Sequence, residues 1–184
     1  MGQYHKVVNL DKRQYLNPHT LGDGLKLMEQ VGSSYGTGSA LLLLLAASNG
    51  RGGGDYNVES EHLGLIGSWA GDRIVVVGNY CEDGDIEWAE EARLPGGLAL
   101  SFTTSSLYHL CSKWDAEELR EWCDEHPDRL VSAMNDDAGD EEWSAAATTV
   151  GFTDIAMEVS RLIEAEGSVV YSNTGYGWRQ RLTA

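Results

Sequence analysis

Arg73-Ile-Val-Val-Val-Gly-Asn-Tyr80 has the strongest strand pattern in the chain. Its apolar residues are consecutive and do not alternate with polar ones, as in strands that are covered on both faces of a sheet. We therefore expect this segment to be a central strand.

Weaker patterns on either side of this strand predict the remaining elements. Apolar runs bounded by turn residues predict strands at residues 4–10, 98–103 and 168–172. Apolar residues at helical spacing predict helices at residues 21–30, 40–47, 115–125 and 153–166. Ser39 is the expected N-cap of the second of these helices.

The helix at residues 115–125 has the clearest end signals. Asp115 is a preferred N-cap residue, and Glu118 stands where the acid of a capping box belongs. Pro127 is expected to stop the helix. The acidic stretch at residues 136–142 is expected to be a solvated loop or the start of another helix.

The order of these elements indicates the fold class. Strands and helices are mixed without a strict strand–helix alternation, which favours an α+β fold over a doubly wound parallel sheet. We expect one mostly antiparallel sheet with helices packed on one face. The length of 184 residues predicts a single globular domain over residues 1–184.

The charge of the chain limits its partners. The formal net charge is -16, with 29 acidic residues against 13 Lys and Arg, of which four are lysines. Such a surface repels phosphate backbones and anionic membranes, so neither nucleic acid nor a membrane is an expected partner. Dense carboxylates with little lysine indicate adaptation to high salt, although an ordinary soluble acidic protein remains the alternative.

Cysteine usage and hydropathy predict a cytoplasmic protein. The three cysteines are too few, and odd in number, for a disulfide framework. The start of the chain has no apolar signal core. The most apolar stretch, residues 40–47, is far shorter than the roughly 20 residues of a membrane span, and we interpret it as a buried helix.

One region has a composition suited to ligand binding. Three successive glycines let backbone N–H groups converge on an anion, and two arginines offer planar donor forks to a phosphate or carboxylate. Two aspartates there could bind a metal or act as a base, and a tryptophan could stack on a ring. The alternative is a surface loop whose arginines pair with local acids. The candidate ligand-binding residues are Asn49, Arg51, Gly52, Gly53, Gly54, Asp55, Trp69, Asp72 and Arg73.

Two further patterns are weaker. The glycine-rich loop at residues 32–39 is neither a Walker loop nor a Rossmann fingerprint, and a plain helix entry is expected there. His109, Cys111, Cys123 and His126 have no standard zinc-finger spacing. Cys123 and His126 instead extend an apolar helical stripe, so we expect buried thiols and no zinc.

The first 80 residues resemble a known group of proteins. They contain Met1-Gly-Gln-Tyr-His, Gly24-Leu-Lys-Leu-Met-Glu29, Asn49-Gly-Arg-Gly-Gly-Gly-Asp-Tyr56 and Gly67-Ser-Trp-Ala-Gly-Asp72. These segments are similar to those of a family of uncharacterised microbial and phage proteins that tend to begin Gly-Gln-Tyr-Tyr. The chain departs from that pattern at His5 and Asn79, where the family has Tyr and Asp. The family has no established activity, so the resemblance implies only where a site would lie, at 49–55 and 69–73.

Two hypotheses of function follow, and neither identifies a catalytic residue or a cofactor. The first is binding or hydrolysis of a small anionic ligand, such as a nucleotide or sugar phosphate, at the arginine- and glycine-rich region. The second is a non-enzymatic acidic interaction protein, a phage or host accessory that engages a basic partner. Convergence of Arg51, Asp55, Asp72 and Arg73 in a cleft would favour the first.

Overall fold

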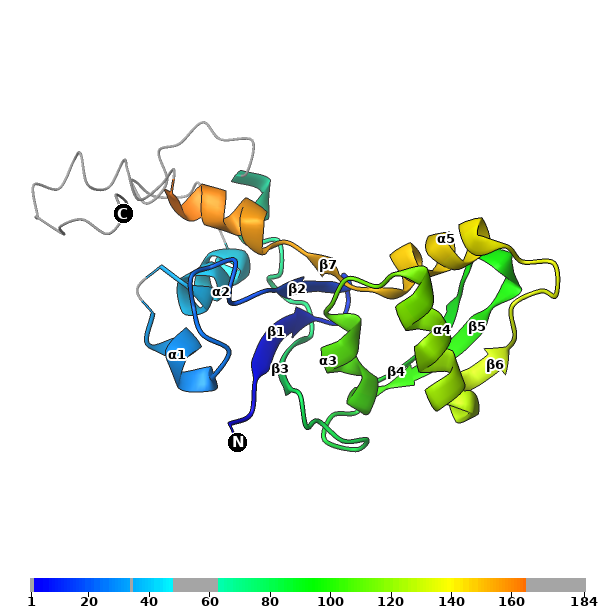
Figure 1. Ribbon diagram of the computed structural model, residues 1–184. Helices are drawn as coiled ribbons and strands as arrows, with labels where there is room; N and C mark the ends of the chain where they lie inside the picture. Colours follow the sequence, from blue (N-terminus) through cyan, green and yellow to red (C-terminus); the bar gives the residue numbers. More distant parts are fainter. Residues whose placement is uncertain (1, 34, 48–62, 165–184) are drawn as a thin grey trace, which may run out of the picture.

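A computed structural model describes residues 2–33, 35–47 and 63–164, and its strands form two sheets (Figure 1). The first sheet has four strands in the order β3-β1-β2-β7. They are β3 (Ile74–Gly78), β1 (His5–Asn9), β2 (Gln14–Leu16) and β7 (Thr153–Asp154). β1 is antiparallel to both of its neighbours, whereas β2 and β7 are parallel.

The second sheet is antiparallel, with the order β4-β5-β6. Its strands are β4 (Ala89–Arg93), β5 (Ala99–Thr103) and β6 (Leu130–Ser132). The α-helices are α1 (Leu27–Val31), α2 (Thr37–Leu45), α3 (Leu107–Leu110), α4 (Ala116–Glu125) and α5 (Asp140–Val150), and residues 156–164 are also helical. Short 3₁₀ helices lie at Leu63–Leu65, Pro95–Gly97, Thr104–Ser106 and Pro127–Arg129.

β1 connects the two parts of the core. Successive residues of a strand point to opposite faces, so Val7 and Val8 enter different clusters. Val8 packs in the larger cluster, which joins the first sheet to the second sheet, α3, α4 and α5. Val7 packs in the smaller cluster with α2 and the helix at residues 156–164. The helices therefore cover both faces of the first sheet, with α1 and α2 at one end of the molecule and α4 and α5 at the other (Figure 1).

The α+β class and the mostly antiparallel pairing are confirmed, but the strands divide into two sheets where one was expected. The second sheet contains β4, whose sequence Ala-Glu-Glu-Ala-Arg has no apolar run. On one face of this strand Ala92 is buried against the core and Glu90 pairs with Arg13, while Glu91 and Arg93 are exposed on the other face. Such a polar strand is typical of the edge of a sheet, and its sequence alone gives little indication that it is a strand.

β3 is an edge strand, and the expectation that it is central was wrong. The central position belongs to β1, where Val7 and Val8 are 3% and 0% exposed, whereas Val76 in β3 is 44% exposed. An unbroken apolar run is typical of a doubly covered strand, but here it stands at an edge where part of one face is open.

Several helix boundaries also differ from expectation. α1 is shorter than expected because Leu21 and Gly22 donate backbone hydrogen bonds in a turn that begins at Pro18. α2 begins earlier, at Thr37, whose backbone N–H donates to the Asp23 carboxylate at 2.6 Å, so Ser39 lies inside the helix. The acidic residues at 136–142 were expected to form a loop or the start of a helix. α5 does begin there, at Asp140, but it continues to Val150, which the sequence did not indicate.

At the C-terminal side, residues Thr153–Asp154 form β7 instead of the start of a helix. The expected strand at residues 168–172 lies outside the described residues. Within the part of the chain that is described, no helix combines the length and the apolar character needed to cross a membrane.

Candidate functional site

Trp69 lies in the core and not in an open site. Its side chain is 0% exposed and packs in the smaller cluster. Its indole Nε1–H donates to Gln14 Oε1 at 2.8 Å, which satisfies the polar atom of a buried tryptophan. The ring therefore stabilises the junction between β2 and the turn before β3, and it has no face open for stacking on a ligand.

Asp72 is held by the turn between β1 and β2. Its Oδ2 accepts a hydrogen bond from Asn9 Nδ2 at 2.8 Å and lies 2.9 Å from Lys12 Nζ. The hydrogen bond from Asn9, followed by that from Lys12, lowers the pKa of Asp72. Asn9 also shapes the turn, because its Oδ1 accepts from the backbone N–H groups of Asp11 and Lys12.

Arg73 is paired with Asp11 of the same turn. Its backbone N–H donates to Asp11 Oδ2 at 2.7 Å, and its Nε donates to Asp11 Oδ1 at 2.8 Å. The backbone hydrogen bond, and then the guanidinium, lower the pKa of Asp11. Asp72 and Arg73 thus lie side by side at the entrance of β3, each bonded to the β1–β2 turn.

The structure therefore shows only part of the candidate site. Asp72 and Arg73 are together, and the Asp72 backbone N–H donates to the Trp69 carbonyl at 3.1 Å, but the Trp69 side chain is buried in the core. Arg73 pairs with the nearby Asp11, as the alternative interpretation of this region expected for its arginines. The rest of the candidate site lies outside the described residues and comprises Asn49, Arg51, Gly52, Gly53, Gly54 and Asp55.

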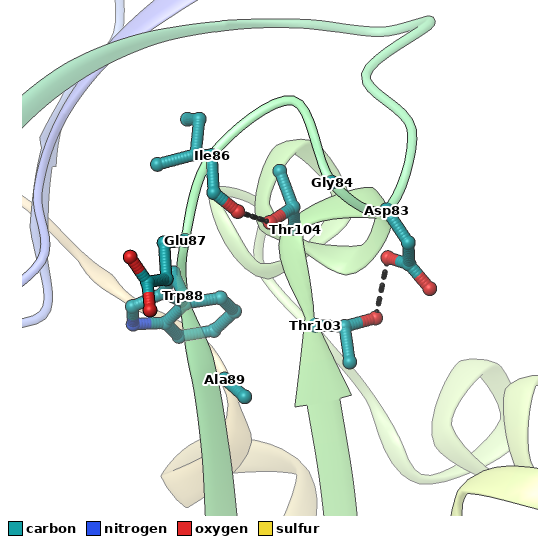
Figure 2. A pocket seen from close by; sticks show the side chains of 8 residues that line it. All are labelled: Asp83, Gly84, Ile86, Glu87, Trp88, Ala89, Thr103 and Thr104. Atoms are coloured by element: carbon teal, nitrogen blue, oxygen red, sulfur yellow. Dashed lines mark hydrogen bonds between the residues drawn. The ribbon is translucent and has the colours of Figure 1, made fainter.

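A shallow hollow of about 340 Å³ lies at one end of the second sheet (Figure 2). Trp88 and Glu87 lie on one side of it, and Asp83 and Thr103 lie on the other. The Asp83 carboxylate accepts hydrogen bonds from Thr103 Oγ1 at 2.6 Å and from the Ser105 backbone N–H at 3.0 Å.

Arg129 completes this cluster. Its Nη2 lies 2.7 Å from Asp83 Oδ2, and its Nη1 donates to Thr103 Oγ1 at 2.7 Å. The hydrogen bonds from Thr103 and Ser105, and then Arg129, hold the pKa of Asp83 well below its usual range. A carboxylate whose pKa is held so low is a weak base and therefore a poor proton-transfer group, and these bonds instead join β5 to the segments before β4 and β6.

The residues considered as zinc ligands were His109, Cys111, Cys123 and His126. The two cysteines belong to the larger core cluster, and neither histidine is buried in it. Cys111 and Cys123 are buried, and burial raises the pKa of the Cys111 thiol to about 12 and that of Cys123 to about 11. His126 stacks on Trp122, and its Nδ1–H donates to the Trp122 carbonyl at 2.9 Å. Among the described residues, no group of three or more His, Cys, Asp or Glu side chains could hold a metal ion.

Lys6 is a buried cation that the sequence did not reveal. Its Nζ donates to the Cys111 carbonyl at 2.5 Å and lies 4.4 Å from the centre of the Tyr108 ring. Burial lowers its pKa. Because its ammonium group bonds the C-terminal end of α3, Lys6 joins β1 to that helix.

Two neighbouring helices expose large apolar side chains. α1 exposes Leu27, Met28 and Val31, which share one side of that helix, and α2 exposes Leu42 and Leu45, which are three residues apart. These five residues are named the α1/α2 surface, since the two helices lie next to each other in Figure 1. Met28 and Leu42 are 74% and 73% exposed.

The sequence of α2 explains this exposure. Its five consecutive leucines are apolar on every side of the helix, and only the side with Ala40 and Leu44 reaches the core. The helix is therefore half buried and not fully buried as expected.

Comparisons with protein-family models, with curated proteins and with solved structures find no match to this chain.

Proposed function

We propose that this protein binds a partner protein through the α1/α2 surface. The observation that carries the proposal is the exposure of Met28 and Leu42 on two neighbouring helices. Soluble proteins bury large apolar side chains where they can, and adjacent exposed ones mark interaction sites. Asp72 and Arg73, the charged site candidates in the described structure, are each bonded to the β1–β2 turn, whereas these apolar side chains are open to solvent.

The charge of the chain indicates the chemistry of the partner. A net charge of -16 repels acidic proteins and attracts basic ones over a distance set by the ionic strength. The partner is therefore a protein with an apolar centre to its contact surface and a basic rim. The apolar centre supplies the binding energy, and the charges set the association rate.

The experiment compares capture by the wild type with capture by Met28→Asp/Leu42→Asp. A matched control is Val131→Asp/Met157→Asp, which adds the same two negative charges at residues outside the α1/α2 surface that are 52% and 50% exposed. A captured protein is then purified, and its affinity for each variant is measured by calorimetry. Loss of at least tenfold in affinity for the α1/α2 variant alone is expected. Equal affinity for all three proteins contradicts the proposal.

Binding of a small anion is a second proposal, and the geometry of Arg73 favours it. Nε and Nη2 of Arg73 are held by Asp11, yet the side chain remains 64% exposed. An arginine fixed in this way can present its remaining donors to a phosphate or carboxylate. Together with Arg51 of the candidate site, it would recognise a nucleotide or sugar phosphate.

A thermal-shift screen of nucleotides and sugar phosphates tests this second proposal. An anion that binds raises the melting temperature of the wild type. Arg51→Ala or Arg73→Ala would then weaken that ligand by about 2 to 5 kcal/mol without a comparable loss of folding stability. The absence of any stabilising anion rejects this proposal and leaves the first one untouched.

A further inference from the structure

One edge of the first sheet has unpaired backbone groups. Arg73 C=O accepts from Leu10 N–H, and Asn79 N–H donates to Tyr4 C=O, so these two residues of the β3 segment face β1. Hydrogen-bonding directions alternate along an antiparallel strand. The N–H and C=O groups of Ile74 and Val76 therefore point away from β1, and within the described structure nothing pairs with them.

The other sheet edges among the described residues are blunted. β7 has two residues, one of them Asp154, and β6 has three residues. β4 contains Glu90, Glu91 and Arg93. Short length and charge are the usual means by which proteins prevent a sheet edge from pairing with another chain.

β3 has none of these protections. Residues 74–80 contain no charge and no proline, in a chain with 42 charged residues. The strand pairs with β1 over five consecutive positions without a bulge. The exposed side chains of Val76 and Tyr80 make this edge apolar as well as unpaired. This combination favours strand addition to the sheet.

We propose that a second copy of this chain pairs with β3 across a twofold axis at Val76. An antiparallel pair centred there is self-complementary, because Val76 would exchange both backbone hydrogen bonds with the partner's Val76. Ile74 would face the partner's Gly78, and Arg73 would face the partner's Asn79. No like charges oppose each other between positions 73 and 79 in this register, and the two sheets become one continuous sheet.

Salt controls this association. Each copy has a net charge of -16, so the two copies repel each other at low ionic strength. In molar salt the screening length falls to about 3 Å, and the repulsion between surface carboxylates no longer opposes the local pairing of backbone groups. We therefore expect a monomer in dilute buffer and a dimer in molar KCl.

The test is sedimentation equilibrium of the full chain in low and molar KCl. Val76→Pro removes an N–H that does not bond to β1, and an edge strand tolerates proline at such a position. Val76→Lys places two like charges opposite each other on the axis and leaves the backbone unchanged. Leu42→Asp is the control, since it alters the α1/α2 surface and not β3.

A second measurement locates the interface. Hydrogen exchange of the Val76 amide should slow at least tenfold in molar KCl when the protein concentration is raised. Circular dichroism and the melting temperature of each variant establish that it is folded. This second readout keeps the test decisive even if one variant fails to fold.

The proposal is supported if the wild type and Leu42→Asp dimerise in molar KCl while both Val76 variants remain monomeric. A wild type that stays monomeric at all salt concentrations overturns it. A monomer with a slowly exchanging Val76 amide also overturns it, because another segment of the same chain then covers the edge. A dimer that persists in both Val76 variants assigns the contact to a different surface.

Discussion

Arg13 and Glu90 form the ion pair that joins the two sheets. Nη1 of Arg13, in the turn between β1 and β2, lies 2.5 Å from Oε1 of Glu90 on β4. Nη2 donates to the Val150 carbonyl at 2.7 Å, and the guanidinium lies 5.2 Å from the centre of the Phe152 ring. One side chain thus contacts β4, the end of α5 and the segment before β7.

Arg13→Ala should lower the free energy of unfolding by about 1 to 3 kcal/mol. The reason is that hydrogen bonds to charged groups contribute about that much when partly buried, and the Val150 carbonyl loses its donor. Arg13 has a positive φ of 52°, and arginine and alanine are similarly strained at such a φ. The substitution therefore changes the backbone contribution to the free energy of unfolding little. Urea denaturation measures the loss. Arg13→Lys keeps the charge without the planar fork and should recover less than half, so full recovery would mean that charge alone matters.

The hydrogen bonds of Asp83 predict that acid weakens the contact between β5 and the segments before β4 and β6. The carboxyl has an ordinary pKa of 3.8, and its hydrogen bonds with Thr103, Ser105 and Arg129 lower the pKa in the folded state. A carboxylate with a lowered folded pKa contributes stability that is present above 3.8 and is lost as the pH falls through the folded value. Asp83→Asn should therefore be less stable than the wild type at neutral pH.

The difference between these two proteins should shrink as the pH is lowered below 4, because the unfolded wild-type chain then binds a proton at Asp83 that the folded carboxylate takes up only at lower pH. Chemical denaturation at a series of pH values measures it. Asp137→Asn, at an exposed acidic position, serves as the control. A stability difference that is the same at pH 7 and at pH 2 would show that the charge of Asp83 has no role.

The success of sequence-based prediction depended on whether the signal was local. The helix α4 begins and ends as expected, because its N-cap, capping box and stop signal all lie within the segment itself. The position of β3 in the sheet was not predictable in this way. It depends on β1, whose Val7 and Val8 are buried on both sides and thereby take the central position.

The candidate site shows the same limit. Asp72 and Arg73 could be recognised from their residue types, but their partners Asn9 and Asp11 are more than 60 positions away in the chain. Only the antiparallel pairing of β1 with β3 brings them together. The exposure of Leu42 was missed for a related reason, since five leucines in a row give no indication of which side meets the core.

The capping box of α4 gives a direct test of a local signal. Asp115 Oδ1 accepts hydrogen bonds from the backbone N–H groups of Glu117 and Glu118, both at 2.9 Å. Asp115→Ala should destabilise the fold by about 1 kcal/mol, because α4 buries Leu119 and Trp122 and cannot fray without exposing them. Asp115→Ser retains a capping oxygen and should lose much less. Equal losses in thermal denaturation for both variants would argue against a capping role.

The surface charge predicts that salt stabilises the protein. The net charge is -16, and α4 alone has Glu117, Glu121 and Glu125 exposed at successive i, i+4 positions. Like charges at this spacing destabilise a helix by about 0.2 to 0.5 kcal/mol per pair, and salt screens them. The melting temperature should therefore rise between low and molar KCl.

Glu121→Lys converts two repulsive pairs into attractive ones, so it should raise the melting temperature at low salt and have a much smaller effect in molar KCl. A wild-type melting temperature that is flat or falls across this range, or a Glu121→Lys effect independent of salt, would rule out carboxylate repulsion as the cause.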